Sequence, residues 1–524
     1  MTFEAPHIDW AYLVPVAVVL GAGVLGVLVE AFVPRRARRI TQIALALLAT
    51  AGAVVAVAAL WSDVSDSGGV KVLDGALVVD GPALVLQGVV ALLGLVALLV
   101  IADRTEAGED AFASAAAAVP GSDAEAEATR RGLAQTEVFP LVLFALGGMM
   151  LFPATADLLT LFVALEVLSL PLYLLAGLAR RRRLLSQEAS MKYFLLGAYA
   201  SAFLLFGIAL LYGFAGSVKL TDIAAAIGTP SDLDPLLLAG VVLLLVGLLF
   251  KVGAVPFHAW TPDAYQGAPT PITGFMAACT KVAAFGAMLR VVYVVLPALE
   301  WDVVPLLSAV AVLTMLVGTV VAIVQTDVKR MLAYSSIAHA GFILVGVVAL
   351  TSSGISGVLV YLLAYGLATI GAFAVVSLVR ESGGPGGAVV AEATHLSQWA
   401  GLGRRSPWLA GAFSLFLLSF AGIPLTAGFT GKFAVFTAAV DGDLWWLALI
   451  GVLASAAAVF FYVRLIVLMY FTDPAGTPGE STTVIGGEGF TIVAIGAAAV
   501  GTILLGVLPS PLLELLADAA RFLP

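Results

Sequence analysis

Charged residues are scarce in this sequence. Only 11% of its 524 residues are Asp, Glu, Lys or Arg, while 61% are hydrophobic, and the mean hydropathy is +1.08. A soluble domain carries about 25% charged residues, and no soluble core could absorb so many apolar side chains. The composition therefore excludes a soluble protein and predicts a membrane protein.

Cysteine and histidine are also scarce. The single cysteine, Cys279, lies in an apolar stretch, which excludes internal disulfides, CxxC redox pairs and a cysteine-held iron–sulfur cluster on this chain. The four histidines are too scattered for metal-ligand spacing, and two of them, His7 and His395, lie in polar segments. The net charge of −9 gives no reason to expect a nucleic-acid partner. We therefore expect no metal and no cofactor on this chain.

Long apolar runs predict an all-α polytopic membrane protein with about fourteen transmembrane helices of roughly 20 residues. The first ten residues contain no Lys or Arg, so we expect the first span to be retained rather than cleaved as a signal peptide. The predicted spans are 10–32, 40–61, 76–102, 137–153, 155–178, 187–214, 235–258, 270–297, 303–325, 330–350, 355–379, 407–437, 443–471 and 487–512.

The basic residues of the loops support this number of spans. Sixteen Arg and Lys residues fall on the odd-numbered connections and two on the even-numbered ones, a pattern that one missed span would scramble. The positive-inside rule then predicts a multi-pass protein of the bacterial inner membrane with both termini on the outer side.

Five ionisable residues fall inside the apolar spans: Glu166, Lys192, Lys251, Lys281 and Lys432. A charge at the bilayer centre costs at least ~2.5 kcal/mol, so such residues face a hydrated interior and usually move ions or protons. The helical rise places Glu166 ~14 Å and Lys281 ~16 Å into the bilayer, too deep to reach either interface. Structural ion pairs are the alternative explanation, but five charges in mid-span favour transport.

Other titratable residues have simpler explanations. His339 could relay protons because imidazole titrates near neutrality, although a lone histidine in a packed helix is commonly only hydrogen-bonded. His258 falls at the end of a span, where we expect a helix-end or exit residue and not a metal ligand. Arg290 and Arg464 lie near the ends of their spans and are explained by snorkelling to the interface.

Two spans are interrupted close to a lysine. Gly253 and Pro256 follow Lys251 in one, while Gly422 and Pro424 precede Lys432 in the other. Broken helices in corresponding places are typical of transporters built from inverted repeats. Spans 4–8 and 9–13 are therefore predicted to form two inverted five-helix repeats with two discontinuous helices. The predicted divisions are 1–136 (spans 1–3 and a loop), 137–298 (first repeat), 299–472 (second repeat) and 473–524 (loop, span 14 and tail).

Two loops, 103–135 and 381–388, are predicted to be unstructured and without chemistry because they are rich in small and polar residues. A GxGxxG pattern at 21–26 lies within an apolar span without a βαβ unit, so we interpret it as helix packing through small residues. Walker, GxSxG and HExxH sequences are absent. This chain therefore neither binds ATP nor cleaves bonds, and the energy for transport must come from elsewhere.

Several motifs together resemble the antiporter-like membrane subunits of the proton-pumping NADH:quinone oxidoreductase, respiratory complex I. The DAYQGAP sequence at 263–269 is similar to the form found in the N-type subunits. Lys432, where M-type subunits have glutamate, and the end of the chain soon after the last span also favour the N type. The matching segments are 165–173, 188–194, 251–271, 280–285, 327–335 and 422–432.

The resemblance implies a translocase subunit without redox chemistry of its own, in which proton transport is driven by electron transfer elsewhere. FMN, iron–sulfur clusters, NADH and quinone are then expected on partner subunits. The partners would be other membrane and peripheral subunits of the complex, including sibling antiporter-like subunits, and the lipid bilayer. A cation/proton antiporter subunit, a hydrogenase membrane arm or a structural scaffold are the alternatives.

The resemblance also implies roles for individual residues. Glu166 with Lys192 and Lys251 would form the switching group, since a nearby carboxylate raises the proton affinity of a buried lysine and its departure lowers it. Lys281 would pass the proton across the centre. Lys432 would lie nearest the exit or the next subunit.

Overall fold

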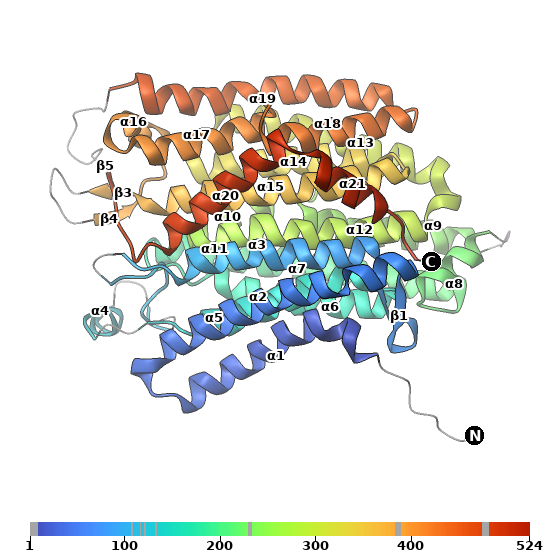
Figure 1. Cartoon of the computed structure of the whole chain (residues 1–524), viewed down its shortest axis with the longest axis horizontal. Helices are drawn as coiled ribbons and strands as arrows, with labels where there is room; N and C mark the ends of the chain where they lie inside the picture. Colours follow the sequence, from blue (N-terminus) through green and yellow to red (C-terminus); the bar gives the residue numbers. More distant parts are fainter. Residues whose placement is uncertain are drawn as a thin grey trace.

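The computed structural model describes residues 9–105, 108–115, 117–119, 122–131, 134–228, 233–382, 389–473 and 482–523. The long helices lie side by side along one common axis, so the molecule has two ends (Figure 1). Twelve helices of the described part are long and apolar enough to cross a membrane, and two shorter apolar helices accompany them. The prediction of an all-α multi-pass membrane protein is confirmed.

The elements follow the predicted spans closely. The N-terminal helices are α1 (Trp10–Phe32), α2 (Arg35–Ser67) and α3 (Gly81–Ala102). The next group is α5 (Val138–Leu151), α6 (Leu158–Ala176), α7 (Arg183–Ala215), α9 (Asp234–Val252), α10 (Trp260–Gly267), α11 (Thr270–Phe275), the π-helix η3 (Met276–Thr280) and α12 (Lys281–Val294). The last group is α13 (Glu300–Val324), α14 (Val328–Val348), α15 (Ser352–Leu378), α17 (Pro407–Ala421), α18 (Ala427–Asp441), α19 (Trp445–Phe471) and α20 (Phe490–Val507). Short helices are α4 (Asp123–Arg130), α8 (Leu220–Ile227), α16 (Leu402–Arg405) and α21 (Ser510–Asp518).

The two ends of the molecule differ in structure. One end holds α4, α16 and a three-stranded antiparallel sheet with the order β4–β3–β5 (Figure 1). We call it the arginine-rich end because these elements carry Arg130, Arg380, Arg404 and Arg405. The opposite end holds the β1–β2 hairpin, α8, the start of α1 and the described C-terminal tail (Figure 1). The strands are β1 (Val70–Val72), β2 (Leu77–Val79), β3 (Val379–Ser382), β4 (Val389–Glu392) and β5 (Thr482–Val484).

The same start motif occurs at opposite ends of the molecule. Asp157 caps α6 by accepting a hydrogen bond from the Thr160 amide, and Asp327 caps α14 through the Arg330 amide. Each aspartate also forms an isolated antiparallel bridge, Asp157 with Lys219 and Asp327 with His395. Because the first bridge lies beside α8 and the second at the arginine-rich end, this arrangement agrees with the predicted inverted repeats.

Both interrupted spans end in the same kind of cap. Gly253 follows α9 with φ of +77°, and Gly422 follows α17 with φ of +81°, a region that residues with a Cβ rarely adopt. In each cap the glycine amide and the next amide bond back to the last turn, with Ala254 to Leu249 at 2.9 Å and Ile423 to Leu418 at 3.1 Å. The glycines therefore stop both helices inside the protein and leave their last carbonyls available.

Three helical segments form the centre of the molecule. The apolar stretches of α15 and of the α11–α12 segment are completely buried, and the apolar stretch of α14 is almost completely buried. In contrast, most residues in the apolar stretches of α1, α2, α7, α19 and α20 are not buried. In α1, Gly23 faces the Phe144 ring and Gly26 faces Pro140 and Gln42, as the packing interpretation of the glycine motif requires. Two of the residues predicted to carry protons, Lys281 and His339, lie on these central segments.

The prediction that the 103–135 loop is unstructured is wrong for its described part. It contains α4. The segment before α4 is held by the Arg180 guanidinium, which donates hydrogen bonds to the Asp110 carboxylate at 2.9 Å and the Ser114 hydroxyl at 3.2 Å. Arg181 pairs with Glu109 at 3.1 Å. The run of arginines before α7 supplies the partners, which composition alone could not reveal. Most of the second loop, 383–388, and His7 lie outside the described residues.

Candidate proton-transfer site

Lys251 lies in the last turn of α9 and is only 3% exposed. Its ammonium donates hydrogen bonds to the Ser169 hydroxyl on α6 at 2.8 Å and the Tyr193 hydroxyl on α7 at 3.2 Å. The Tyr193 ring lies 5.3 Å below the ammonium and stacks on Trp260. An ammonium at this depth is stable only with such partners, so Lys251 faces the protein interior as predicted.

Lys281 starts α12 directly after the π-helical turn η3, a distortion that often marks functional sites. It is 2% exposed, and its ammonium donates to the Val252 carbonyl at 3.0 Å and the Ser336 carbonyl at 2.6 Å. The first of these carbonyls is one that the break after α9 leaves free. The negative end of the α9 dipole therefore points at a lysine.

Lys432 repeats this arrangement at the second break. It lies on α18, is 5% exposed and donates to the Phe420 carbonyl at 2.8 Å and the Ala421 carbonyl at 3.1 Å, the last residues of α17. A third bond goes to the Ser455 hydroxyl at 2.7 Å. Each broken helix thus presents its freed carbonyls to one buried ammonium.

His339 lies between these two lysines on α14. It is 2% exposed, and its ring nitrogens bond to the Tyr361 hydroxyl at 2.8 Å and the Tyr462 hydroxyl at 3.2 Å. Lys281 and Lys432 are both close enough to act on the imidazole electrostatically. The Phe420 ring packs on His339 while its carbonyl binds Lys432. These contacts link Lys251, Lys281, His339 and Lys432 in one buried row.

Glu166 and Lys192 have different polar partners. The Glu166 carboxylate accepts a 2.6 Å bond from the Ser201 hydroxyl and acts electrostatically on Lys251 from the turn of α6 before Ser169. Lys192 instead pairs with Glu188 at 2.7 Å and with Asp263 at 2.8 Å, and its side chain is 44% exposed. Lys192 therefore forms its ion pairs with Glu188 on its own helix and with Asp263 on α10, and the expected pairing with Glu166 stays a prediction.

The explanation of Arg290 by snorkelling is wrong. Arg290 is 1% exposed and forms a buried ion pair with Asp80 at 2.7 Å, while its Nε donates to the Pro153 carbonyl at 2.8 Å. Arg464, by contrast, is exposed and donates to the Ile323 carbonyl at 3.1 Å, as expected of a snorkelling side chain. His258 lies in the turn between α9 and α10, so it is a helix-end residue as expected.

Sequence reasoning missed several polar residues beside the row. The tyrosines that hold His339 lie on α15 and α19 and look like ordinary core aromatics in the sequence. Ser336 lies nine residues after Asp327, as Glu166 lies nine residues after Asp157, and this equivalent spacing is the one signal that could have revealed it.

The fold and this row of buried cations define a class, the polytopic membrane proteins that carry cations along charged residues between broken helices. The family model described as NADH:quinone oxidoreductase/Mrp antiporter, TM, matches residues 155–458, which include all of these residues. This chain belongs to that family, and the predicted resemblance is confirmed.

Comparison with full-length relatives shows which members of the family this chain is most similar to in sequence. The chain is 66% identical to NADH-quinone oxidoreductase subunit N of Beutenbergia cavernae, covering 100% of both chains. It is 53% identical to subunit N of Mycobacterium tuberculosis strain H37Rv, again over 100% of both. A chain of respiratory complex I from Thermus thermophilus with bound aureothin is 34% identical, with a TM-score of 0.76 and coverage of 96% of this chain and 100% of that one. A chain of the Mrp complex from Dietzia sp. DQ12-45-1b shares the fold, at 23% identity, a TM-score of 0.79 and 97% coverage of both chains.

Proposed function

We propose that this chain is the proton-translocating membrane subunit N of a proton-pumping NADH:quinone oxidoreductase. The observation that carries this proposal is the buried row from Lys251 to Lys432, in which the carbonyls of two broken helices hold lysines. The hydrogen bonds of these ammonium groups in the described structure go to carbonyl and hydroxyl oxygens, so each lysine suits a relay. The alternative of a separate cation/proton antiporter is less favoured, because the full-length relatives are named as subunit N.

In this proposal Glu166 sets the proton affinity of Lys251. When the carboxylate approaches, the ammonium is stabilised and Lys251 loads; when it withdraws toward Ser201, Lys251 releases its proton. Lys281 then carries the charge past the break after α9, and His339 with its two tyrosines bridges to Lys432. Moving one charge against 100 mV takes ~2.3 kcal/mol, which electron transfer in partner subunits must supply.

The location and partners follow from the same assignment. The arginine-rich end lies in the cytoplasm by the positive-inside rule, which places both termini on the outer side of a bacterial inner membrane. NADH, FMN, iron–sulfur clusters and quinone belong to other subunits of the complex. Sibling antiporter-like subunits are its neighbours in the membrane arm.

The decisive experiment compares Lys251→Ala with wild type in the assembled complex, reconstituted into vesicles. We expect the rate of NADH-driven proton pumping to fall in the variant. Lys219→Ala is the matched control, because this lysine is on a surface connection at the end opposite the arginine-rich end. Wild-type pumping by an assembled Lys251→Ala complex, or co-purification of the chain without an NADH-oxidising arm, contradicts the proposal.

A further inference from the structure

A cavity of about 480 Å³ opens at the arginine-rich end, outside the row of lysines. Its walls come from segments far apart in the sequence: the 103–111 segment, the run of arginines before α7, the turn between α10 and α11, the start of α14, and the sheet. Six cations and four carboxylates are among the lining residues. The cavity is therefore a polar chamber in which positive charge is in excess.

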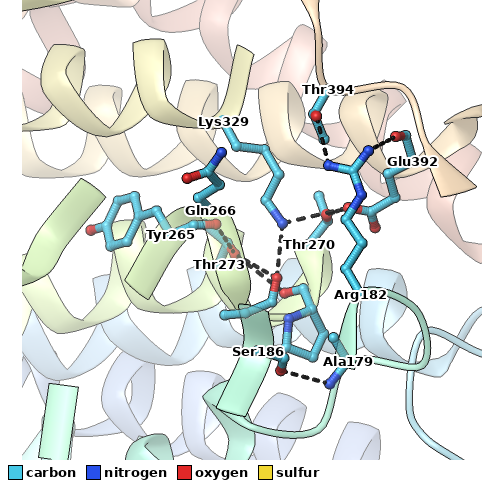
Figure 2. Close-up of polar contacts among 12 residues, drawn as sticks. Ala179, Arg182, Ser186, Tyr265, Gln266, Thr270, Thr273, Lys329, Glu392 and Thr394 are labelled. Carbon is cyan, nitrogen blue, oxygen red and sulfur yellow. Dashed lines mark hydrogen bonds and ion pairs between the residues drawn. The ribbon is translucent and has the colours of Figure 1, made fainter. Parts of the chain in front are cut away.

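The Glu392 carboxylate at the wall of this cavity serves two cations. One of its oxygens lies 3.4 Å from the Lys329 ammonium and accepts a 2.6 Å hydrogen bond from the Thr270 hydroxyl (Figure 2). The other oxygen lies 3.4 Å from the Arg380 guanidinium. The side chains of Lys329, Glu392 and Arg380 are only 2%, 18% and 13% exposed. One negative charge therefore balances two positive charges in a largely buried place.

The Asp110 carboxylate is shared in the same way. Arg180 donates a hydrogen bond to it at 2.9 Å, and the Arg104 guanidinium lies 3.5 Å from it. The other two lining arginines each have a carboxylate partner of their own, and the Asp103 carboxylate accepts hydrogen bonds from two backbone amides. Positive charge thus remains in excess, which is costly in a largely buried place unless an anion balances it.

Two of the arginines also have hydrogen-bond donors to spare. The Nε groups of Arg104 and Arg380 are buried and have no hydrogen-bond partner among the described residues. Burial lowers the pKa of the Arg380 guanidinium, and the nearby Arg181 cation lowers it further, although Glu392 opposes both effects. Water would satisfy the free donors, but only an anion would satisfy them and also balance the charge.

One extended segment holds both arginines at the cavity. In β5, Thr483 pairs with Arg380 of β3. Beyond the strand, the Glu488 amide donates a 3.0 Å hydrogen bond to the Arg104 carbonyl. A Cβ on Gly487 would lie only 2.8 Å from that carbonyl, so this close approach requires glycine. The segment thus connects the end of α3 to the sheet and places both guanidinium groups on the cavity wall.

From these observations we propose that the cavity binds a phosphate-bearing anion, with Arg104 and Arg380 as its main ligands. Guanidinium groups suit phosphate because their N–H groups can donate to two of its oxygens at once. A phosphate monoester carries about −1.5 to −2 charge at pH 7, which would balance the positive excess. The bound anion would also hold the 103–111 segment against the sheet.

The size of the cavity leaves room for the group that carries the phosphate. Pockets for small molecules measure roughly 300–1,000 Å³, and this one measures about 480 Å³. That group is either a soluble metabolite or the headgroup of an anionic lipid, and both present the same phosphate chemistry to the arginines. The site lies outside the row of lysines, and its occupation does not depend on the proposed function.

Protection of a cysteine beside Arg380 tests the site. Thr483 lines the cavity opposite Arg380, so Thr483→Cys should react with N-ethylmaleimide, a neutral reagent that the charges do not repel. Cys279, the chain's own thiol, is completely buried, and the unsubstituted chain gives the background. The full chain is purified in detergent with the subunits that accompany it and labelled in the presence of inorganic pyrophosphate or of phosphatidylglycerol micelles.

We expect at least one of these two probes to slow the labelling of Thr483→Cys severalfold, and the probe that protects at the lower concentration identifies the source of the phosphate. Sodium chloride at the same ionic strength and phosphatidylcholine micelles should leave the rate unchanged. Lys71→Cys, exposed in β1 at the opposite end, should label at the same rate with every addition. Absence of protection by both probes would overturn the proposal.

Two conservative variants in the Thr483→Cys chain test the ligands. Arg380→Lys and Arg104→Lys keep the charge but remove the Nε donor, and each tests the site if the other fails to fold. The probe concentration that halves the labelling rate should rise roughly 10- to 100-fold in each, as expected for the loss of one hydrogen bond between charged groups. Arg404→Lys is the matched control, because this arginine at the same end is 68% exposed and lies outside the cavity lining. Protection that is equally strong in all three variants would contradict the assignment.

Discussion

Replacing Arg290 with methionine removes one partner of a buried ion pair that ties distant parts of the chain together. The Asp80 carboxylate caps α3 through the Ala83 amide at 3.0 Å and accepts a 3.0 Å bond from the Leu523 amide in the tail. The Arg290 guanidinium lies 4.9 Å from the Phe522 ring centre. The substitution therefore affects the start of α3 and the docking of the C-terminal tail together.

The expected loss is large for one side chain. Breaking a buried pair by removing one partner costs ~3–5 kcal/mol, because the remaining charge is buried without compensation. Arg464→Met is the matched control, since it removes an exposed arginine whose hydrogen bond to the Ile323 carbonyl is worth ~0.5–1.5 kcal/mol. The double variant Arg290→Met/Asp80→Asn should regain part of the loss, because asparagine keeps the cap and removes the charge.

Unfolding in mixed micelles with increasing dodecyl sulfate measures these differences. Hydrogen exchange of the peptide that contains Leu523 reports separately on the tail, whose protection should fall in Arg290→Met. A loss of less than ~1.5 kcal/mol for Arg290→Met, equal to that of Arg464→Met, would show that Arg290 behaves as a snorkelling arginine and would refute the reasoning.

Three further predictions follow from other parts of the structure. Gly422→Ala adds a Cβ at a φ of +81° and 2.9 Å from the Lys432 side chain, so it should lower the free energy of unfolding by ~1–2 kcal/mol and slow pumping. Gly496→Ala, which has open space around it, should have neither effect. Unfolding and pumping assays on both variants would decide. Burial raises the pKa of Glu392, but Lys329, Arg380 and Thr270 outweigh it and hold the pKa below 4.5. The stability from this lowered pKa is present above pH 4.5 and is lost as the pH falls through the folded value, so melting curves of wild type between pH 5 and 3 should show a loss that Glu392→Gln lacks. Arg180→Ala should release the segment around Asp110 and speed proteolysis within the 103–135 loop, and unchanged cleavage would contradict the tie.

The sequence alone was enough to predict the membrane fold and the burial of most of the cations in the row. Apolar runs of helical length indicate spans whatever their partners, since the bilayer imposes one length on all of them. The cost of burying charge placed Lys251, Lys281 and Lys432 in the interior, and the structure shows each of them buried. Gly253 and Gly422 indicated the helix breaks because their conformations are local properties of the backbone.

The tertiary structure decided which charged side chains pair with each other. Lys192 contacts Asp263, and Arg290 finds Asp80 some 210 residues away, because helix packing and not sequence spacing sets which side chains meet. The cavity with Lys329 and Glu392 is likewise assembled from several loops and helix ends, so no single segment carries its signal. The cost of burying a charged residue can be estimated from that residue and its neighbours in the chain. The partner of a buried charge, in contrast, depends on how separate helices pack against each other.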